Sequence, residues 1–95
     1  MNLLSSMRYL VALSEHKHFG RAAEACHITQ PALSNAIKAL ELELGATIVR
    51  RDRHFVGLTS EGERVLASSH VMLREQALLM HELQGDKDGP SGDIR

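Results

Sequence analysis

Apolar residues in the middle of the chain repeat with a helical period. Between residues 29 and 45 they recur mostly every three or four positions, at Leu33, Ala36, Ile37, Leu40 and Leu44. This spacing gathers them on one face of an α-helix and predicts that the helix is buried on that side. Thr29 can cap the first turn, Pro31 suits a first-turn position, and Gly45 suits the left-handed residue after the last turn.

The opposite face of this predicted helix is polar. It carries Gln30, Ser34, Asn35, Lys38 and Glu41. Amide, hydroxyl and ammonium groups at short reach can hydrogen-bond a base edge or a phosphate. A short helix that is buried on one side and displays such groups near its start is typical of a recognition helix in the DNA major groove. The competing interpretation is a polar face that only contacts water.

Two shorter helices are predicted before this one. Residues 3–15 carry apolar side chains at helical spacing, and Asn2 can cap their first turn. A polar turn closed by Gly20 follows, and residues 21–27 form a short helix whose small side chains allow another helix to cross closely. With the helix that follows, this predicts a helix-turn-helix over about residues 20–40.

The pattern becomes extended after that helix. Residues 48–49 and 55–58 indicate two short strands around a charged turn, which predicts a basic wing over about residues 47–59. A long helix is then predicted over residues 60–84, with a capping box formed by Ser60 and Glu63.

Apolar residues repeat every seven positions along the last helix. The stripe consists of Val65, Leu66, Met72, Leu73, Leu79, Met80 and Leu83. It is too long for so small a domain to cover, which predicts a partner helix from a second copy of the chain. The alternative is that the stripe serves the core alone. Residues 85–95 are polar and rich in Gly and Pro, as expected for a hinge.

Composition limits the compartment and the class of protein. The 95 residues suffice for one domain, and a single cysteine excludes an internal disulfide framework and fits a reducing compartment. The sequence contains no apolar run of 18 residues and no secretory signal pattern, so we expect a cytoplasmic protein without a membrane span.

Net charge at first argues against a nucleic-acid partner. The whole chain carries a formal charge of −1. Residues 1–65 nevertheless hold eight Lys and Arg against seven Asp and Glu, and Arg50, Arg51 and Arg53 form a local basic cluster. Because attraction to phosphate is short-ranged in salt, this cluster matters more than the total.

Other chemistry has little support in the sequence. His16, His18, Cys26 and His27 match no standard spacing of metal ligands, so we expect no metal and no cofactor. Cys26 is expected to be a buried structural thiol. The chain has no phosphate loop, no nucleophile with a neighbouring base and no paired carboxylates, so we do not expect an enzyme.

The combined motifs carry a family resemblance. They are Ala22-Ala23, Thr29-Gln30-Pro31-Ala32-Leu33-Ser34, Ile37, Leu40-Glu41, Leu44-Gly45, Arg51, Val56, Leu58-Thr59 and Gly62. Over residues 3 to about 84 the sequence resembles the N-terminal domain of LysR-type transcriptional regulators. The resemblance implies a mainly α fold: a winged helix-turn-helix over residues 1–59, with three helices and a two-stranded wing, followed by a linker helix.

The resemblance also implies partners. It implies a homodimer whose linker helices pair antiparallel. Full-length family members continue into a periplasmic-binding-protein-like domain that senses a small-molecule effector and mediates tetramers. We expect that domain to be absent from this chain, which would end in the hinge.

The resemblance assigns DNA contacts residue by residue. Those of the helix fall on Thr29, Gln30, Pro31, Ser34, Asn35 and Lys38, and those of the wing fall on Arg51 and the turn after it. The family's minor-groove arginine corresponds to His54, with Arg53 beside it, so either residue can take this role. Asn35 departs from the family's usual Arg or Gln-type residue, and Ile48-Val49 replaces the usual Leu-Phe.

The sequence therefore predicts sequence-specific binding of double-stranded DNA by a homodimer on an interrupted inverted repeat. The predicted helix from residue 29 would lie in the major groove, and the wing would lie in the minor groove or on the backbone. The alternative is a winged-helix module for protein interaction or dimerisation that does not bind DNA, which the near-neutral charge favours.

Overall fold

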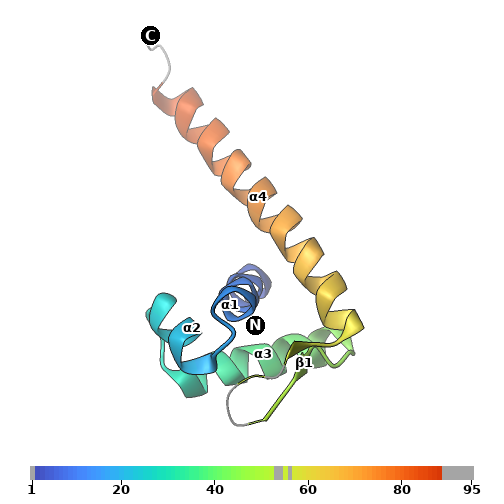
Figure 1. The fold of residues 1–95 in the computed structure, drawn as a ribbon. Helices are drawn as coiled ribbons and strands as arrows, with labels where there is room; N and C mark the ends of the chain where they lie inside the picture. Colours follow the sequence, from blue (N-terminus) through green and yellow to red (C-terminus); the bar gives the residue numbers. More distant parts are fainter. Residues whose placement is uncertain (1, 53–54, 56, 89–95) are drawn as a thin grey trace.

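The computed structural model of the chain describes residues 2–52, residue 55 and residues 57–88. Its elements are α1 (Leu3–His16), α2 (Phe19–Ala25), α3 (Gln30–Leu44), β1 (Val49–Arg50), β2 (Gly57–Leu58) and α4 (Ser60–Asp88). The first three helices and the hairpin gather at one end, and α4 projects away from them (Figure 1). The molecule measures 53 × 25 × 21 Å. The predicted winged helix-turn-helix with a long last helix is confirmed.

Helix α1 ends one residue later than predicted. The Asn2 side chain accepts a hydrogen bond from the Ser5 amide at 3.0 Å, so the predicted cap is present. At the other end Lys17 adopts a left-handed conformation, with φ 57°, and its amide donates to the Leu13 carbonyl. Polar residues close both ends of the helix.

The prediction for the second helix was wrong at both ends. Helix α2 spans Phe19–Ala25 rather than 21–27, and Gly20 lies inside its first turn instead of closing a turn. Nδ1 of His18 accepts from the Arg21 amide and caps the helix, while the buried ring of Phe19 anchors its start. His27 lies outside the helix, with φ 59°.

Helix α3 has the predicted ends. Oγ1 of Thr29 accepts from the Ala32 amide at 3.2 Å, Pro31 lies in the first turn, and Gly45 follows the helix with φ 67°. Leu33, Ile37 and Leu40 are fully buried, and Ala36 is half-buried. Leu44 is 43% exposed, so the prediction that the apolar stripe reaches the last turn was wrong.

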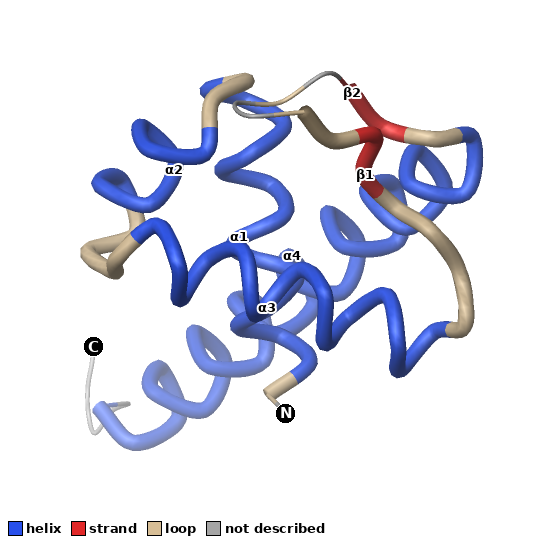
Figure 2. Tube along the Cα trace, turned by 90° about the horizontal axis from the view of Figure 1, so that it is seen from below, coloured by secondary structure: helices blue, strands red, loops and turns tan. Residues whose placement is uncertain are grey.

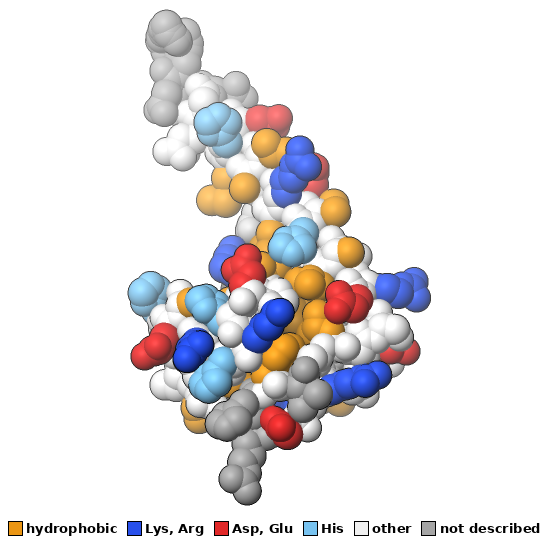
Figure 3. All heavy atoms as spheres, viewed as in Figure 1, with side chains coloured by type: hydrophobic (Ala, Val, Ile, Leu, Met, Phe, Trp, Pro, Cys, Tyr) orange, Lys and Arg blue, Asp and Glu red, His pale blue; other side chains and the backbone are white. Residues whose placement is uncertain are grey.

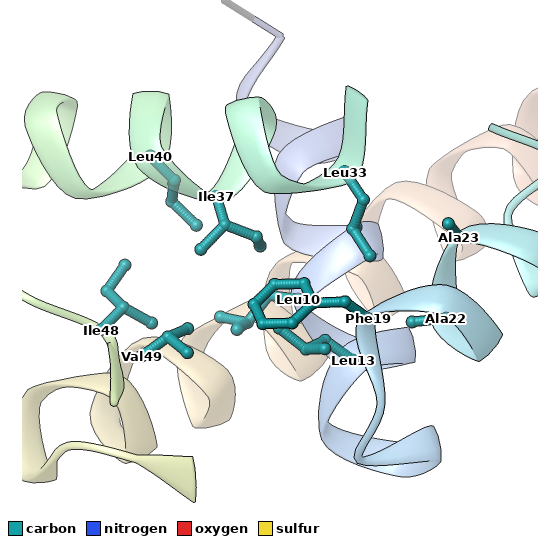
Figure 4. Close-up of a cluster of buried hydrophobic side chains, with 10 residues drawn as sticks. All are labelled: Leu10, Leu13, Phe19, Ala22, Ala23, Leu33, Ile37, Leu40, Ile48 and Val49. Carbon is teal, nitrogen blue, oxygen red and sulfur yellow. The ribbon is translucent and has the colours of Figure 1, made fainter. Parts of the chain in front are cut away.

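The core lies between α1, α2, α3 and the segment that leads into β1 (Figure 4). Its fully enclosed members are Leu10, Leu13, Leu33, Ile37, Leu40 and Ile48. Ala22 and Ala23 are also buried, and their small side chains let α2 lie close to its neighbours. Viewed from below, α2 lies toward one end of α3 and the hairpin toward the other (Figure 2).

The hairpin is short and is tied to α3. Val49 pairs with Leu58 and Arg50 with Gly57, in antiparallel register. Oε2 of Glu41 accepts hydrogen bonds from the amides of Ile48, at 2.8 Å, and Val49, at 3.1 Å. Glu41 was assigned to the polar outer face of α3, but its carboxylate turns toward the hairpin and secures it.

The capping box predicted for the last helix was wrong. Oγ1 of Thr59 accepts from the Gly62 amide at 2.9 Å, so Thr59 caps α4 and Ser60 is its first helical residue. Close packing requires glycine at position 62, because a Cβ there would collide with the Ile48 carbonyl. The helix continues to Asp88, into the segment predicted as a hinge. Within the described residues no helix is long and apolar enough to cross a membrane.

Replacing Leu33 with Ala should lower the free energy of unfolding by about 2–5 kcal/mol, because it leaves a cavity in the core. The control is Leu42→Ala on the same helix, where the side chain is 85% exposed and a change within about 0.5 kcal/mol is expected. Urea denaturation followed by circular dichroism measures both. Equal losses for the two variants would contradict the assignment of the buried face.

Candidate nucleic-acid interface

The polar face of α3 is accessible. Five of the six contact residues predicted on this helix are exposed, namely Thr29, Gln30, Pro31, Asn35 and Lys38. The sixth, Ser34, is half-buried. No acidic residue occupies the first turn of α3, so nothing there opposes the partial positive charge of the helix N-terminus. This end of the helix can receive an anion or a hydrogen-bond acceptor.

The exposed amides lie at different margins of this face. Gln30 lines a hollow at the start of α2, together with His18 and Arg21. Asn35 lines another hollow, between α1 and α3, together with Tyr9. Gln30 therefore lies at a hollow that Arg21 and Glu24 of α2 also line, while Asn35 lies on the α1 side.

Ser34 is engaged by a residue that follows β1. Nη1 of Arg51 donates a hydrogen bond to Oγ of Ser34 at 3.1 Å. Nη2 of Arg51 lies 3.6 Å from Oε1 of Glu41, and the Arg51 side chain is 24% exposed. Two sites predicted independently, one on the helix and one on the wing, are thus joined.

An aromatic pair supports the same guanidinium. The Arg51 Cζ lies 5.4 Å from the centroid of the Phe19 ring, a distance at which a cation is attracted to the π-system. Phe19 meets Phe55 edge-to-face, with ring centroids 6.2 Å apart and an interplanar angle of 77°. The start of α2 and the wing are therefore linked through Arg51.

The other predicted and basic residues of the interface differ in what the structure describes. Arg53 and His54 lie outside the described residues, and their roles stay predictions. Arg50 on β1 is exposed, as is Lys38 on α3. Both side chains are available for contact with phosphates.

The bacterial regulatory helix-turn-helix model of the lysR family matches residues 4–63. The chain belongs to this LysR family.

Similar proteins extend this assignment. The "DNA-binding transcriptional dual regulator OxyR" of Escherichia coli K12 is 41% identical over 91 residues, which cover 96% of this chain and 30% of that protein. A full-length OxyR structure from Pseudomonas aeruginosa is 47% identical, with a TM-score of 0.76, over 85% of this chain and 27% of that one. The BenM_DBD/benA site 1 DNA complex is 31% identical, with a TM-score of 0.84, over 94% and 99% of the two chains.

The LysR-family chain spans about 30% of the length of the first curated relatives it matches. Each of these matches covers 96% of this chain. The similarity to the full-length regulators therefore concerns this part of their length.

The sequence analysis missed the contribution of three residues. Arg21 is exposed in the first turn of α2 and lines the same hollow as Gln30. Glu41 and Phe19 brace Arg51. The sequence offered one local indication of Arg21, because it follows His18, a residue able to cap a helix, by three positions. No short-range pattern pairs Glu41 or Phe19 with a wing residue.

Cys26 is half-buried rather than fully buried as predicted. Burial raises the pKa of its thiol, and the nearby charge of Arg8 opposes this shift more weakly. Among the described residues, no group of three or more His, Cys, Asp and Glu side chains is placed to hold a metal ion.

Alkylation of Cys26 should have a pH–rate midpoint above that of an unstructured cysteine peptide. The thiolate is the reactive form, and a raised pKa delays its formation as pH increases. Iodoacetamide labelling followed by mass spectrometry across pH 7–10 measures the midpoint. A midpoint at or below the peptide's would show that burial does not govern this thiol.

Proposed function

We propose that this chain binds double-stranded DNA in a sequence-specific manner, as the DNA-binding part of a LysR-type transcriptional regulator. Helix α3 enters the major groove, and the wing lies in the minor groove or on the backbone. The observation that carries this proposal is the exposed polar face of α3, held outward by the fully buried Leu33, Ile37 and Leu40. A protein that binds chromosomal DNA in this way acts in the cytoplasm. DNA binding requires no catalytic step.

The similarity to a complex that contains DNA supports the same function. The BenM_DBD complex holds benA site 1 DNA, and it shares its fold with 94% of this chain at 31% identity. An α-helix fits the major groove, and its first turns commonly reach the bases. In this chain the first turns of α3 carry Gln30, Ser34 and Asn35.

The residues of the interface divide by chemistry. Gln30 and Asn35 can each form two hydrogen bonds with an adenine edge, and Ser34 can bond a base or a phosphate. Lys38 lies further along α3, and Arg50 lies on the hairpin. As flexible cations they suit phosphates, which contribute affinity without sequence preference. Thr29 and Pro31 set the start of the helix and lie beside the same groove.

The proposed DNA-binding unit is a homodimer formed through α4. Large apolar side chains are exposed along this helix, including Val71, Met72, Leu78, Leu79, Met80 and Leu83. On the face shown in Figure 3, apolar side chains follow α4 away from the globular end. An apolar surface of this extent is unusual on a monomer and indicates a protein partner. An antiparallel copy of α4 would cover it and would present two α3 helices to an interrupted inverted repeat.

The seam that we propose differs from the predicted set at its beginning. Val65 and Leu66 pack partly against the chain's own core. Leu73 is half-buried, whereas Leu79, Met80 and Leu83 are each more than half exposed. The proposed seam therefore starts near Met72 and includes Val71 and Leu78, which the heptad pattern did not select.

Gln30→Ala should relax the preference for one base pair, with a loss of about 1–3 kcal/mol on the preferred sequence and little on others. The matched comparison is Lys38→Ala on the same face. It should weaken binding to all sequences about equally and reduce the salt slope by about 1. Selection of bound DNA from a random pool and mobility shift at several salt concentrations measure both effects. Uniform losses for both variants would contradict the division of roles.

Leu79→Lys combined with Leu83→Lys should convert the dimer into a monomer, because it places charges in the apolar seam. Analytical ultracentrifugation measures the mass. The control is Leu42→Lys, at an exposed site on α3, which should leave the dimer intact. A dimer that survives the double substitution would exclude this part of α4 as the seam.

A further inference from the structure

Arg51 is restrained on three sides, unlike a wing cation that reaches freely for phosphate. Its Nη1 donates to Ser34 Oγ at 3.1 Å, its Nη2 lies 3.6 Å from the Glu41 carboxylate, and its Cζ lies 5.4 Å from the centroid of the Phe19 ring. The Nη2 atom is enclosed and, within the described part of the chain, makes no hydrogen bond. The guanidinium is thus held against α3 and Phe19, with its Nη2 atom shielded from solvent.

The bond to Arg51 fixes what the Ser34 hydroxyl can offer. A serine hydroxyl has one hydrogen to donate and two lone pairs that accept, whereas a guanidinium only donates. Ser34 Oγ therefore accepts from Arg51 with one lone pair, and it keeps its hydrogen and the other lone pair. Ser14 and Ser69 differ, because each donates its hydrogen to a carbonyl of its own helix at 2.7 Å. Among the described residues the Ser34 hydroxyl makes no such bond.

The positive charge of Arg51 strengthens the donor character of the Ser34 hydroxyl. A hydrogen bond from a cation is stronger than one between neutral groups, and a hydroxyl that accepts such a bond becomes a better donor. Ser34 lies between the exposed residues Gln30 and Lys38 on the helix face that the proposed function directs at DNA. A donor hydroxyl at this place selects for an acceptor on the partner.

We propose that Arg51 is a positioning residue that biases the Ser34 hydroxyl toward donating a hydrogen bond to DNA. In the major groove the matching acceptors are guanine O6 and N7, adenine N7 and thymine O4, whereas cytosine presents only its N4 amino donor there. Arg51 thereby sets a base preference without contacting DNA. The inference rests on the proposed function, and it assigns to Arg51 a role different from the direct wing contact expected from the family resemblance.

The test is a double-mutant cycle on base preference. Wild type, Ser34→Ala, Arg51→Met and the double variant are each used to select bound duplexes from a random pool, and affinities for the selected site and its single-base variants are then measured. Methionine keeps an unbranched apolar stem over the Phe19 ring and removes every donor. Arg50→Ala is the matched control, since this neighbouring arginine is exposed and does not bond Ser34.

The expected result is a shared, non-additive loss. Arg51→Met and Ser34→Ala should reduce discrimination against cytosine at the same position by about 3–10-fold each, and the double variant should lose no more than Ser34→Ala. Arg50→Ala should weaken all sites equally. Independent losses that multiply in the double variant would overturn the proposal, because they would show that Arg51 contacts DNA itself or only stabilises the wing.

Two further observations separate the possible failures. A wild-type chain that binds no duplex would overturn the proposed function, whereas binding with multiplicative losses overturns only the role of Arg51. If circular dichroism shows that Arg51→Met is unfolded, the cycle is run with Glu41→Gln. This variant keeps an oxygen for the Ile48 and Val49 amides but removes the charge beside Arg51 Nη2. The same non-additivity with Ser34→Ala is expected, and additive losses would overturn the proposal.

Discussion

Burial of one side of α3 is the constraint on which the rest of the structure depends. Leu33, Ile37 and Leu40 are completely shielded from solvent between α1, α2 and the segment entering β1. Removing this much apolar surface from water is the main favourable term available to so small a chain. Because the three side chains share one face of the helix, their burial fixes its rotation. Gln30, Asn35 and Lys38 on the other face then point outward.

A second set of interactions joins the hairpin to the same helix. Glu41 accepts two amides from the start of β1 and faces Arg51, and Arg51 reaches back to Ser34. The two-stranded hairpin has only two residues in each strand, too few to hold its position alone. Its orientation relative to α3 therefore depends on these contacts and on Val49, which is buried in the core. The outward side of α3 and the hairpin therefore form one surface.

Local rules predicted most of this architecture. The ends of α3 follow from Thr29, Pro31 and Gly45, whose preferences act within one or two turns. The predicted boundaries of α2 were wrong because Gly20 was interpreted as the end of a turn before the helix. The cap formed by His18 and the buried ring of Phe19 decide where that helix begins. The cap of α4 was assigned one residue too late.

The site was predicted less completely than the fold. The exposed polar residues of α3 follow from helical periodicity. The bond between Arg51 and Ser34 joins residues 17 positions apart, and it requires Glu41 and Phe19 to be in place. No periodic pattern encodes such a contact, because it forms only when α2, α3 and the hairpin have packed together.

The most direct test of the account is whether the outward face of α3 meets the duplex. In NMR titration of the isotopically labelled chain with a selected duplex at low ionic strength, the largest shift changes should fall on the side chains of Gln30 and Asn35 and on the amides of the first turns of α3. Changes confined to α4, or no change at all, would contradict it.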